Sequence, residues 1–255
     1  MKIATWNVNS IKARMVNTTE WLRTAAPDVL LLQEIKCLTA DFPTLELQAL
    51  GYRAAVVGQR TYNGVAILSR LPITDVIERL PGDGTDDQAR YVEGTVDGLR
   101  VASIYLPNGN PVASDKYPYK LAWMARLRDH VQTLLASERA FVLGGDYNVA
   151  PTDDDVYDPL AWQDDALCRP PTRAAFRRIM HLGLIDAFRA VDERAGQYTY
   201  WDYQAGRWQR DEGLRIDHLL LSPQAADRLA AAGIDRGPRG RDKASDHTPI
   251  WCELK

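Results

Sequence analysis

The sequence has few of the residues that would cross-link the chain or anchor it in a membrane. Its three cysteines, Cys37, Cys168 and Cys252, are odd in number and share no ligand spacing, which argues against a disulfide framework or a zinc site. No apolar run reaches transmembrane length, and the chain enters an apparent strand from its first residues without a signal peptide. We therefore expect free thiols, a cytoplasmic location and no membrane partner.

The chain also lacks an excess of positive charge. Lysine and arginine number 31 and aspartate and glutamate number 34, so the formal net charge is −3 at pH 7. Nucleic-acid-binding domains are usually basic, and this balance counts mildly against such a partner. Net charge is only a sum, however, and a basic strip can lie beside an acidic metal site.

No internal repeat and no low-complexity linker divides the 255 residues, so we expect one domain over residues 1–255. Hydrophobic residues make up 45% of the chain, which is enough for a substantial core. Predicted strands outnumber predicted helices, and the Asp97-Gly98 dipeptide marks a two-residue hairpin turn. Hairpins mixed with single crossover helices favour an α/β domain of packed mixed sheets over a purely parallel, doubly wound sheet.

Three predictions concern the second half of the chain. Thr172 is expected to cap a helix over residues 172–182, and residues 198–203 and 214–221 are expected to pair as a hairpin. The acidic run Asp153–Asp155 is interpreted as a solvated loop in preference to a metal cluster, because charge runs usually face solvent.

The most informative stretch is Gly144-Gly145-Asp146-Tyr147-Asn148, which follows the apolar run 140–143. That run predicts a buried strand. Asp146 and Asn148 point to the same face if the backbone stays extended, because side chains alternate along a strand. An acid and an amide placed together at a strand end suit a site that holds a water or a metal against a phosphate. An Asx-rich turn that simply caps the strand is an equally good explanation of this stretch alone.

Other predicted strands end in polar side chains of the same kinds. Several such ends indicate a shared rim, because loops at strand ends carry functional groups on a rigid scaffold. Hard oxygen ligands with an imidazole and no thiolate suit Mg²⁺ or Mn²⁺ and suit Zn²⁺ poorly. These groups are Asn7, Glu34, Tyr105, Asn108, Asp146, Asn148 and the pair Asp246-His247, and Asp217 is one extra acid inside an otherwise apolar predicted strand.

Six segments then occur in order: Thr5–Ser10, Leu32–Lys36, Tyr105–Gly109, Gly145–Asn148, Arg215–Asp217 and Ser245–His247. Together they resemble the motifs of the exonuclease III group of AP endonucleases, in the endonuclease/exonuclease/phosphatase superfamily. Lys36, directly after Gln33-Glu34-Ile35, is typical of the DNA-repair branch of that superfamily. The resemblance implies a four-layered α/β sandwich of the DNase I type, with two mixed β-sheets face to face and helices outside.

The resemblance also implies a role for each matching residue. Glu34 would be the main Mg²⁺ ligand, helped by Asn7 and Asp246, and Mn²⁺ is expected to substitute. Asp146, Asn148 and His247 are placed with this metal set as well as in catalysis. The base that activates water would be Asp146 or His247. Asp217 would hold the second nitrogen of His247, and Tyr105 and Asn108 would donate hydrogen bonds to the phosphate or the leaving group. Lys36 would bind the substrate. A pocket for a flipped abasic sugar would be lined by Tyr200, Leu214 and Ile216.

The implied function is that of a Mg²⁺-dependent AP endonuclease and 3′→5′ exodeoxyribonuclease in base-excision repair. It would cut 5′ to an abasic site, leave a 3′-hydroxyl, act on double-stranded DNA with abasic sites or 3′ ends, and be a monomer. Trp208 suits either a wedge into the duplex or packing within its loop. Two alternatives are a phosphoesterase for lipid or nucleotide substrates and a non-catalytic DNA-end-binding protein.

Overall fold

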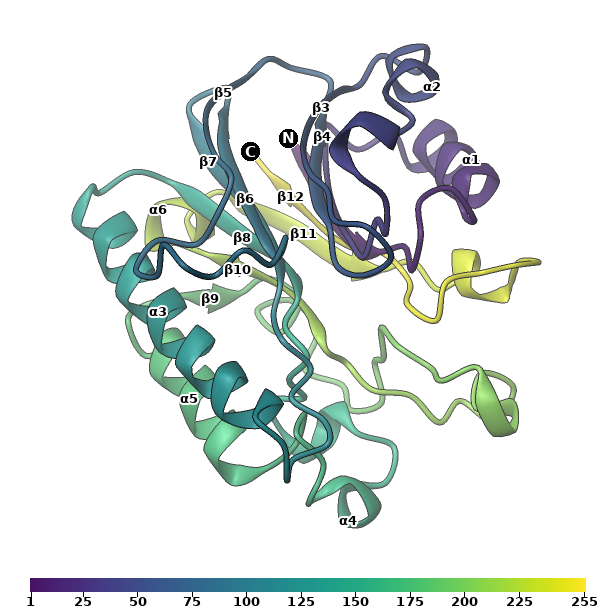
Figure 1. Ribbon diagram of the computed structural model, residues 1–255, viewed down its shortest axis with the longest axis vertical. Coiled ribbons are helices and arrows are strands. Elements are labelled where there is room, and N and C mark those ends of the chain that lie inside the picture. The colour runs from purple at the N-terminus through teal and green to yellow at the C-terminus, as the bar shows by residue number, and fades with distance from the viewer.

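Two mixed six-stranded sheets form the centre of the computed structural model, which describes residues 1–255 (Figure 1). The first sheet contains, in spatial order, β11 (Leu229–Ile234), β12 (Ile250–Leu254), β1 (Lys2–Asn7), β2 (Val29–Gln33), β4 (Val65–Ser69) and β3 (Arg53–Val57). The second contains β5 (Ile73–Ile77), β6 (Tyr91–Val96), β7 (Leu99–Tyr105), β8 (Phe141–Asp146), β10 (Asp217–Leu221) and β9 (Ile185–Asp186).

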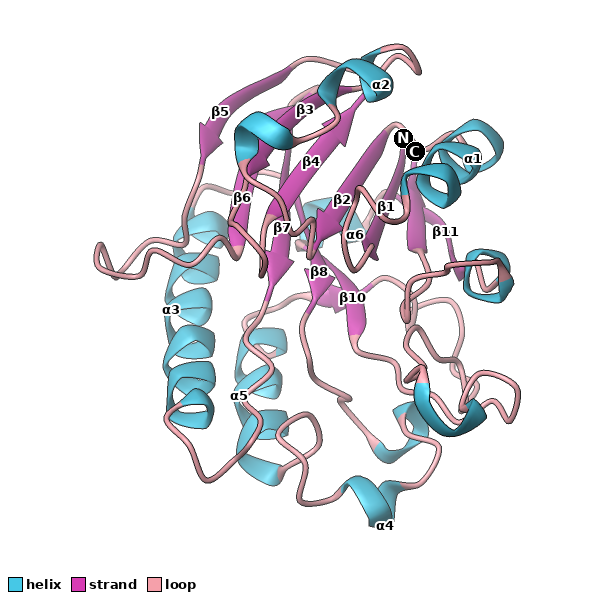
Figure 2. Ribbon diagram, turned by 45° about the vertical axis from the view of Figure 1, so that its right-hand side comes forward, coloured by secondary structure: helices cyan, strands magenta, loops and turns pink.

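The main helices lie outside the two sheets, which completes the four layers predicted from the sequence (Figure 2). The first sheet carries α1 (Met15–Ala25) and α2 (Thr44–Gln48), and the second carries α3 (Lys116–Ala136) and α5 (Pro170–Met180). Short helices occur in the connections: α4 (Pro159–Trp162), α6 (Pro223–Ala226) and the 3₁₀ turns η1 (Thr39–Asp41), η2 (Asp153–Asp155), η3 (Gln204–Gly206) and η4 (Gly237–Gly240).

Each sheet is buried on both faces, which explains why its central strands are continuously apolar. In β2, Val29 and Leu31 belong to the core between the sheets, whereas Leu30 and Leu32 belong to the core beneath α1. This division follows from the alternation of side chains along a strand. A third core packs α3 and α5 against the outer face of the second sheet.

The strand directions bring several chain segments to one rim of the sandwich. β1 runs parallel to β2, and β7 runs parallel to β8, so these strands end at the same side. β10 is antiparallel to β8, and its first residue, Asp217, lies opposite Asp146. β12 is antiparallel to β1, which places the residues before β12 near Asn7. The termini lie together at the top of Figure 1, where the Met1 amino group donates to Leu254 O at 2.5 Å.

Two of the predicted elements are wrong in detail. α5 begins at Pro170, two residues earlier than predicted, and Thr172 does not cap it but donates its hydroxyl to Ala166 O at 2.7 Å. Residues 198–203 form no strand: Tyr200 and Leu214 make only an isolated bridge, and β10 begins at Asp217. β5 and β11 were not predicted at all.

The expectation of a solvated loop is also wrong for one member of the acidic run. Asp155 is fully buried and binds two arginines, Arg215 at 2.7 Å and Arg189 at 2.5 Å. Arg215 in turn binds Asp186 at 2.6 Å. This network lies directly beneath the start of β10 and ties it to the preceding loop.

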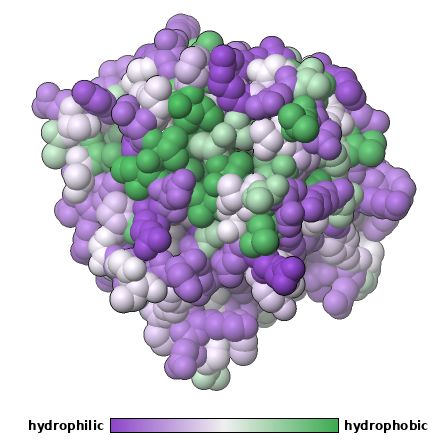
Figure 3. Space-filling model, turned by 45° about the horizontal axis from the view of Figure 1, so that its top comes forward, coloured by the Kyte–Doolittle hydropathy of each residue, from purple (hydrophilic) through white to green (hydrophobic).

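None of the helices has the length and apolar character needed to cross a bilayer. Seen with its top turned forward, the molecule shows a band of hydrophobic residues bordered by hydrophilic ones (Figure 3). Exposed side chains of β5, Val76 and Ile77, add to the apolar surface of the chain.

A buried carboxylate, Glu93 on β6, holds α3 against the second sheet. It accepts hydrogen bonds from Tyr91 at 2.5 Å and His130 at 2.9 Å, and it forms an ion pair with Arg100. Burial alone would raise the pKa of Glu93, but the hydrogen bonds from these partners lower it to about 2 from an ordinary value of 4.5. The contribution of Glu93 to stability is therefore present above the ordinary value and is lost as the pH falls toward about 2.

We expect Glu93→Gln to lower the free energy of unfolding by about 3 kcal/mol near neutral pH, given this shift. The difference from the native chain should shrink as the pH falls from about 5 to about 2, measured by urea unfolding. Glu46→Gln, at an exposed position on α2, serves as the control and should differ little from the native chain at any pH. A Glu93→Gln deficit that stays constant with pH would contradict this account.

Candidate active site

The polar strand ends predicted from the sequence meet at one cavity of about 230 Å³. The loop after β2 and the segment before β12 supply groups from the first sheet, and β7, β8, the loops that follow them and the segment before β10 supply groups from the second. Glu34 and Asn148 adopt positive φ angles of 50° and 48°, a strained backbone that is often found at functional sites. The lining residues are Glu34, Tyr105, Asn108, Asn110, Asp146, Asn148, Trp162, Asp165, Leu167, Tyr200, Ile216, Asp246 and His247.

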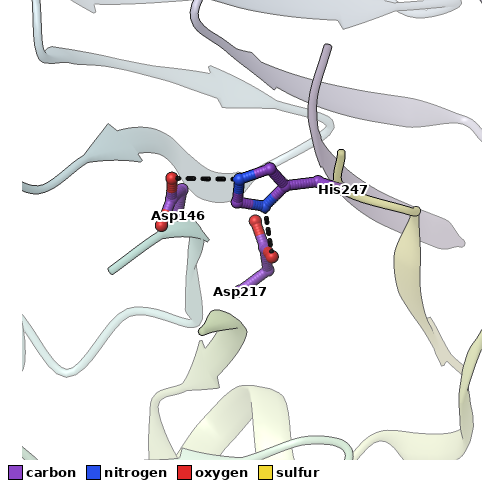
Figure 4. Close-up of side chains that lie close together, drawn as sticks. All are labelled: Asp146, Asp217 and His247. Carbon is purple, nitrogen blue, oxygen red and sulfur yellow. Dashed lines mark hydrogen bonds and ion pairs between the residues drawn. The ribbon is translucent and has the colours of Figure 1, made fainter. Parts of the chain in front are cut away.

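His247 lies between two carboxylates (Figure 4). Its Nδ1 is 2.8 Å from Asp217 Oδ2, and its Nε2 is 3.8 Å from Asp146 Oδ2. Burial disfavours the charged imidazolium, but the charges of Asp217 and Asp146 outweigh that effect and raise the pKa of His247 to about 10. The imidazole is therefore protonated at neutral pH and presents an N–H to the cavity.

Asp146 is held by its neighbours in an orientation that leaves it free to act on a ligand. Asn7 Nδ2 donates to its Oδ2 at 2.9 Å, and the backbone N–H of Asn148 donates to its Oδ1 at 2.9 Å. Burial raises the pKa of Asp146 to about 7, although the charge of His247 acts in the opposite direction. A carboxylate with such a pKa suits general-base chemistry near neutral pH.

Glu34 joins the two sheets across the cavity floor. Its Oε1 accepts from Asn7 Nδ2 and from the Tyr105 hydroxyl, both at 2.9 Å, and its Oε2 pairs with Lys36 at 2.8 Å. Burial opposes ionisation, yet the charge of Lys36 and the hydrogen bond from Asn7 lower the pKa of Glu34. The ammonium of Lys36 also donates to Asn9 Oδ1 at 2.5 Å, and Lys36 does not line the cavity.

The chemistry of the donor set fits a divalent cation at Glu34 and Asp246. Asp246 is half-buried, and its Oδ1 accepts from Asn9 Nδ2 at 3.1 Å, which orients the carboxylate. A second group of acidic and imidazole atoms, Asp146, Asp217 and His247, also lies within 4.8 Å. That group is a poorer cation site, because the protonated imidazole between its carboxylates already neutralises part of their charge.

The amide groups at the cavity rim form a chain of hydrogen bonds. Asn108 Nδ2 donates to Asn148 Oδ1 at 3.0 Å, and Asn148 Nδ2 donates to Leu106 O at 2.9 Å. Asn108 is exposed, whereas Asn148 is 4% exposed, so the first can meet a ligand from solvent and the second supports it.

A residue that sequence reasoning missed, Lys120 on α3, holds the backbone of both rim loops. It is completely buried, and its ammonium donates to Asn108 O at 3.0 Å and to Asn148 O at 2.6 Å. Burial lowers the pKa of Lys120 to about 7. A signal was present in the sequence, because Lys120 shares the helical spacing of the apolar positions Trp123, Met124 and Leu127.

Two of the three residues predicted to line a sugar pocket lie at the cavity. Tyr200 and Ile216 line the cavity, and the Tyr200 ring lies 4.9 Å from the His247 ring. Leu214 is 1% exposed and packs one layer behind, in the small core that also contains Ile216 and Leu167. Leu167 lines the cavity, as does Trp162, although no local pattern in the sequence marked either one. Trp208 packs edge-on against Trp201 at 4.8 Å, which supports the structural role for it.

Comparison with known proteins identifies the group to which this arrangement belongs. Residues 4–247 match the model of the endonuclease/exonuclease/phosphatase family. The chain is 31% identical to exodeoxyribonuclease III of Haemophilus influenzae, over 100% of both chains. It resembles the solved structure of the 3′ phosphatase NExo from Neisseria bound to product DNA hairpin, with 40% identity, a TM-score of 0.97 and coverage of 100% of this chain and 99% of the other.

A third relative is an AP endonuclease from Archaeoglobus fulgidus, at 34% identity and a TM-score of 0.96, covering 100% of this chain and 99% of that one. The family match, the relatives and the site geometry agree. The chain therefore belongs to the endonuclease/exonuclease/phosphatase family, in its exodeoxyribonuclease III and AP endonuclease group of nucleases.

Proposed function

We propose that the protein is a Mg²⁺-dependent AP endonuclease and 3′→5′ exodeoxyribonuclease of base-excision repair. It hydrolyses the phosphodiester 5′ to an abasic site in double-stranded DNA and leaves a 3′-hydroxyl. The observation that carries this proposal is the meeting of carboxylates, a protonated imidazole and amides from five chain segments at one cavity. The printed names of the relatives, which include an AP endonuclease and an exodeoxyribonuclease III, support the same substrate class.

The residues divide the work of hydrolysis among them. Asp146, with its pKa near 7, deprotonates the attacking water, and its hydrogen bonds to Asn7 and Asn148 fix its direction. His247 is charged and donates to an oxygen of the scissile phosphate, while Asp217 holds the ring in place. Because His247 is already protonated, Asp146 is the base of choice between the two.

Two further hydrogen-bond donors can bind the phosphate and the leaving oxygen. The Tyr105 hydroxyl, now bonded to Glu34, and the amide of Asn108 both face the cavity. Glu34 and Asp246, with Asn7 beside them, would hold the divalent ion. When bound, such an ion neutralises phosphate charge as a Lewis acid. We propose Mg²⁺ because the donors are hard oxygens.

The decisive measurement uses a duplex with one abasic analogue, incubated with Mg²⁺ or with EDTA. We expect incision 5′ to the lesion in Mg²⁺, with Mn²⁺ as a substitute, and none in EDTA. Activity confined to an inositol phosphate or a sphingomyelin would refute the nuclease proposal. DNA binding without cleavage at any metal concentration would identify a non-catalytic end-binding protein instead.

A second candidate function is removal of a 3′ phosphate. The specific observation in its favour is the 40% identity to the 3′ phosphatase NExo over the whole chain. A hairpin with a 3′ phosphate, tested beside the abasic duplex at equal concentration, separates the two activities by their kcat/KM ratio. The cytoplasmic location and the monomeric state stay predictions.

We expect Asp146→Asn to lower kcat by about 10³-fold, because a general base contributes on this scale. The variant should keep the native melting temperature within a few degrees, since the amide preserves the shape and one of the two hydrogen bonds that the carboxylate accepts. Asp97→Asn, at the exposed β6–β7 turn, is the matched control and should retain full activity. Near-native turnover by the Asp146 variant would assign the base to another group.

We expect Lys120→Met to lower kcat by about 10²-fold while KM changes little, because small displacements of catalytic groups carry penalties of this size. The substitution leaves two carbonyl groups without their donor and frees the loops of Asn108 and Asn148. Steady-state kinetics on the abasic duplex, with a melting curve for each variant, give the measurement. A variant that loses stability but keeps kcat would show that Lys120 serves the fold alone.

A further inference from the structure

The outer helices α3 and α5 lie side by side on the second sheet and leave a hollow between them (Figure 1 and Figure 2). The hollow is a cavity of about 140 Å³, which we call the α3–α5 pocket. It shares no residue with the active-site cavity, so a ligand bound there leaves the candidate active site free. Its apolar wall is formed by Leu121, Met124, Ala125, Pro171 and Ala175, and its rim by Arg128 and Arg178.

The α3–α5 pocket exists because Ala125 and Ala175 stand where larger side chains would close the gap between the helices. Met124 is buried and forms part of the core beneath α3, whereas Ala125 and Pro171 are exposed, so the pocket has an apolar floor and opens to solvent. An apolar cavity of roughly 150 Å³ is large enough to hold benzene. The pocket therefore has room for one bulky apolar side chain.

The surface around the pocket is cationic, although the whole chain has a net charge of −3. The only acidic residue in either helix is Asp129. Arg128 pairs with Asp129, its exposed neighbour in the chain, at 2.6 Å, whereas Arg178 and the adjacent Arg177 are exposed and form no ion pair. Exposed ion pairs such as the one with Asp129 are weak, so both rim arginines can bind carboxylates of a ligand. This local excess of positive charge favours an acidic partner.

An apolar hollow with a cationic rim selects a particular class of ligand. Double-stranded DNA matches the charge, but its bases are stacked inside the duplex and offer no apolar group that could enter the hollow. An extended peptide matches both features, because a single short segment presents an apolar side chain together with carboxylates on either side of it. Recognition of acidic motifs by arginine clusters is a recurring mode of peptide binding.

We propose that the α3–α5 pocket is a docking site for an acidic peptide segment of a partner protein, in which a bulky apolar residue is flanked by aspartates or glutamates. The apolar residue enters the hollow at Ala125 and Ala175, and the flanking carboxylates pair with Arg128 and Arg178. The inference goes beyond the proposed nuclease function and uses none of the residues assigned to catalysis. A bound partner lies on the outer helices while the active-site cavity stays open.

The test titrates labelled synthetic peptides with the full chain and follows fluorescence anisotropy. The probe is a phenylalanine flanked on both sides by runs of aspartate; matched peptides carry serine in place of the phenylalanine or lysines in place of the aspartates. The variants are Arg178→Gln and Ala125→Leu, which fills the hollow, and both positions are exposed on helices, so the fold should be preserved. Arg177→Gln and Ala122→Leu, exposed on the same helices but outside the pocket, are the matched controls.

We expect the native chain to bind the aspartate–phenylalanine peptide with a Kd below about 1 mM and to bind the lysine peptide not at all. The serine peptide should bind roughly 10- to 100-fold more weakly, which is the effect of losing one buried aromatic side chain. Arg178→Gln should weaken binding of the probe about 3-fold, because it removes one exposed ion pair, and Ala125→Leu should weaken it about 10-fold or more. Both controls should match the native chain.

Absence of probe binding up to about 1 mM would overturn the proposal. Equal losses in Arg178→Gln and Arg177→Gln, with native affinity in Ala125→Leu, would overturn it as well, because they indicate a diffuse attraction between charges. Self-association in sedimentation experiments that Ala125→Leu abolishes would assign the pocket to a second copy of the chain, and weaker binding of the abasic duplex by Arg178→Gln alone would assign it to DNA. Incision of that duplex is read in a separate assay, where failure of the native chain refutes the nuclease function and leaves peptide binding unaffected.

Discussion

The site depends on a fixed position of one sheet relative to the other. The two sheets share no strand pairing, and apolar packing between them has no direction of its own. Buried hydrogen bonds supply that direction: Gln33 Nε2 donates to Ser103 Oγ at 2.9 Å, and Ser103 Oγ donates to Leu32 O at 2.8 Å. Gln33 directly precedes Glu34, and Ser103 lies two residues before Tyr105. The contact between Glu34 and Tyr105 is therefore set by the bonds immediately beneath it.

The concentration of negative charge at this rim is tolerated because each carboxylate has a positive or donating neighbour. Glu34 has Lys36, and Asp217 and Asp146 share the imidazolium of His247. A lone buried carboxylate would take up a proton instead of remaining charged. Asp146 lies close to that limit, since its pKa is about 7, and this is what makes it competent to accept a proton from water.

Much of this arrangement was predictable from the sequence, because a change from apolar to polar residues marks the end of a strand. Asn7, Glu34, Asp146 and His247 follow or precede such runs, and six ordered motifs strengthened the assignment. β5 and β11 escaped prediction for a physical reason. β5 is largely exposed, and β11 is rich in alanine, so pairing with neighbouring strands stabilises them and their own residues do not.

The cavity walls were harder to predict, because loops place residues by contacts that are remote in sequence. Leu167 reaches the lining, whereas Leu214, in a strand-like segment, lies behind it. Net charge misled in a similar way. The total of −3 says nothing about where the charges lie: Asp155 and Asp186 pair internally with Arg189 and Arg215, and these four charges cancel in the sum. The charge that a ligand meets is set by the groups that stay unpaired at the surface, and the net charge does not say where those groups lie.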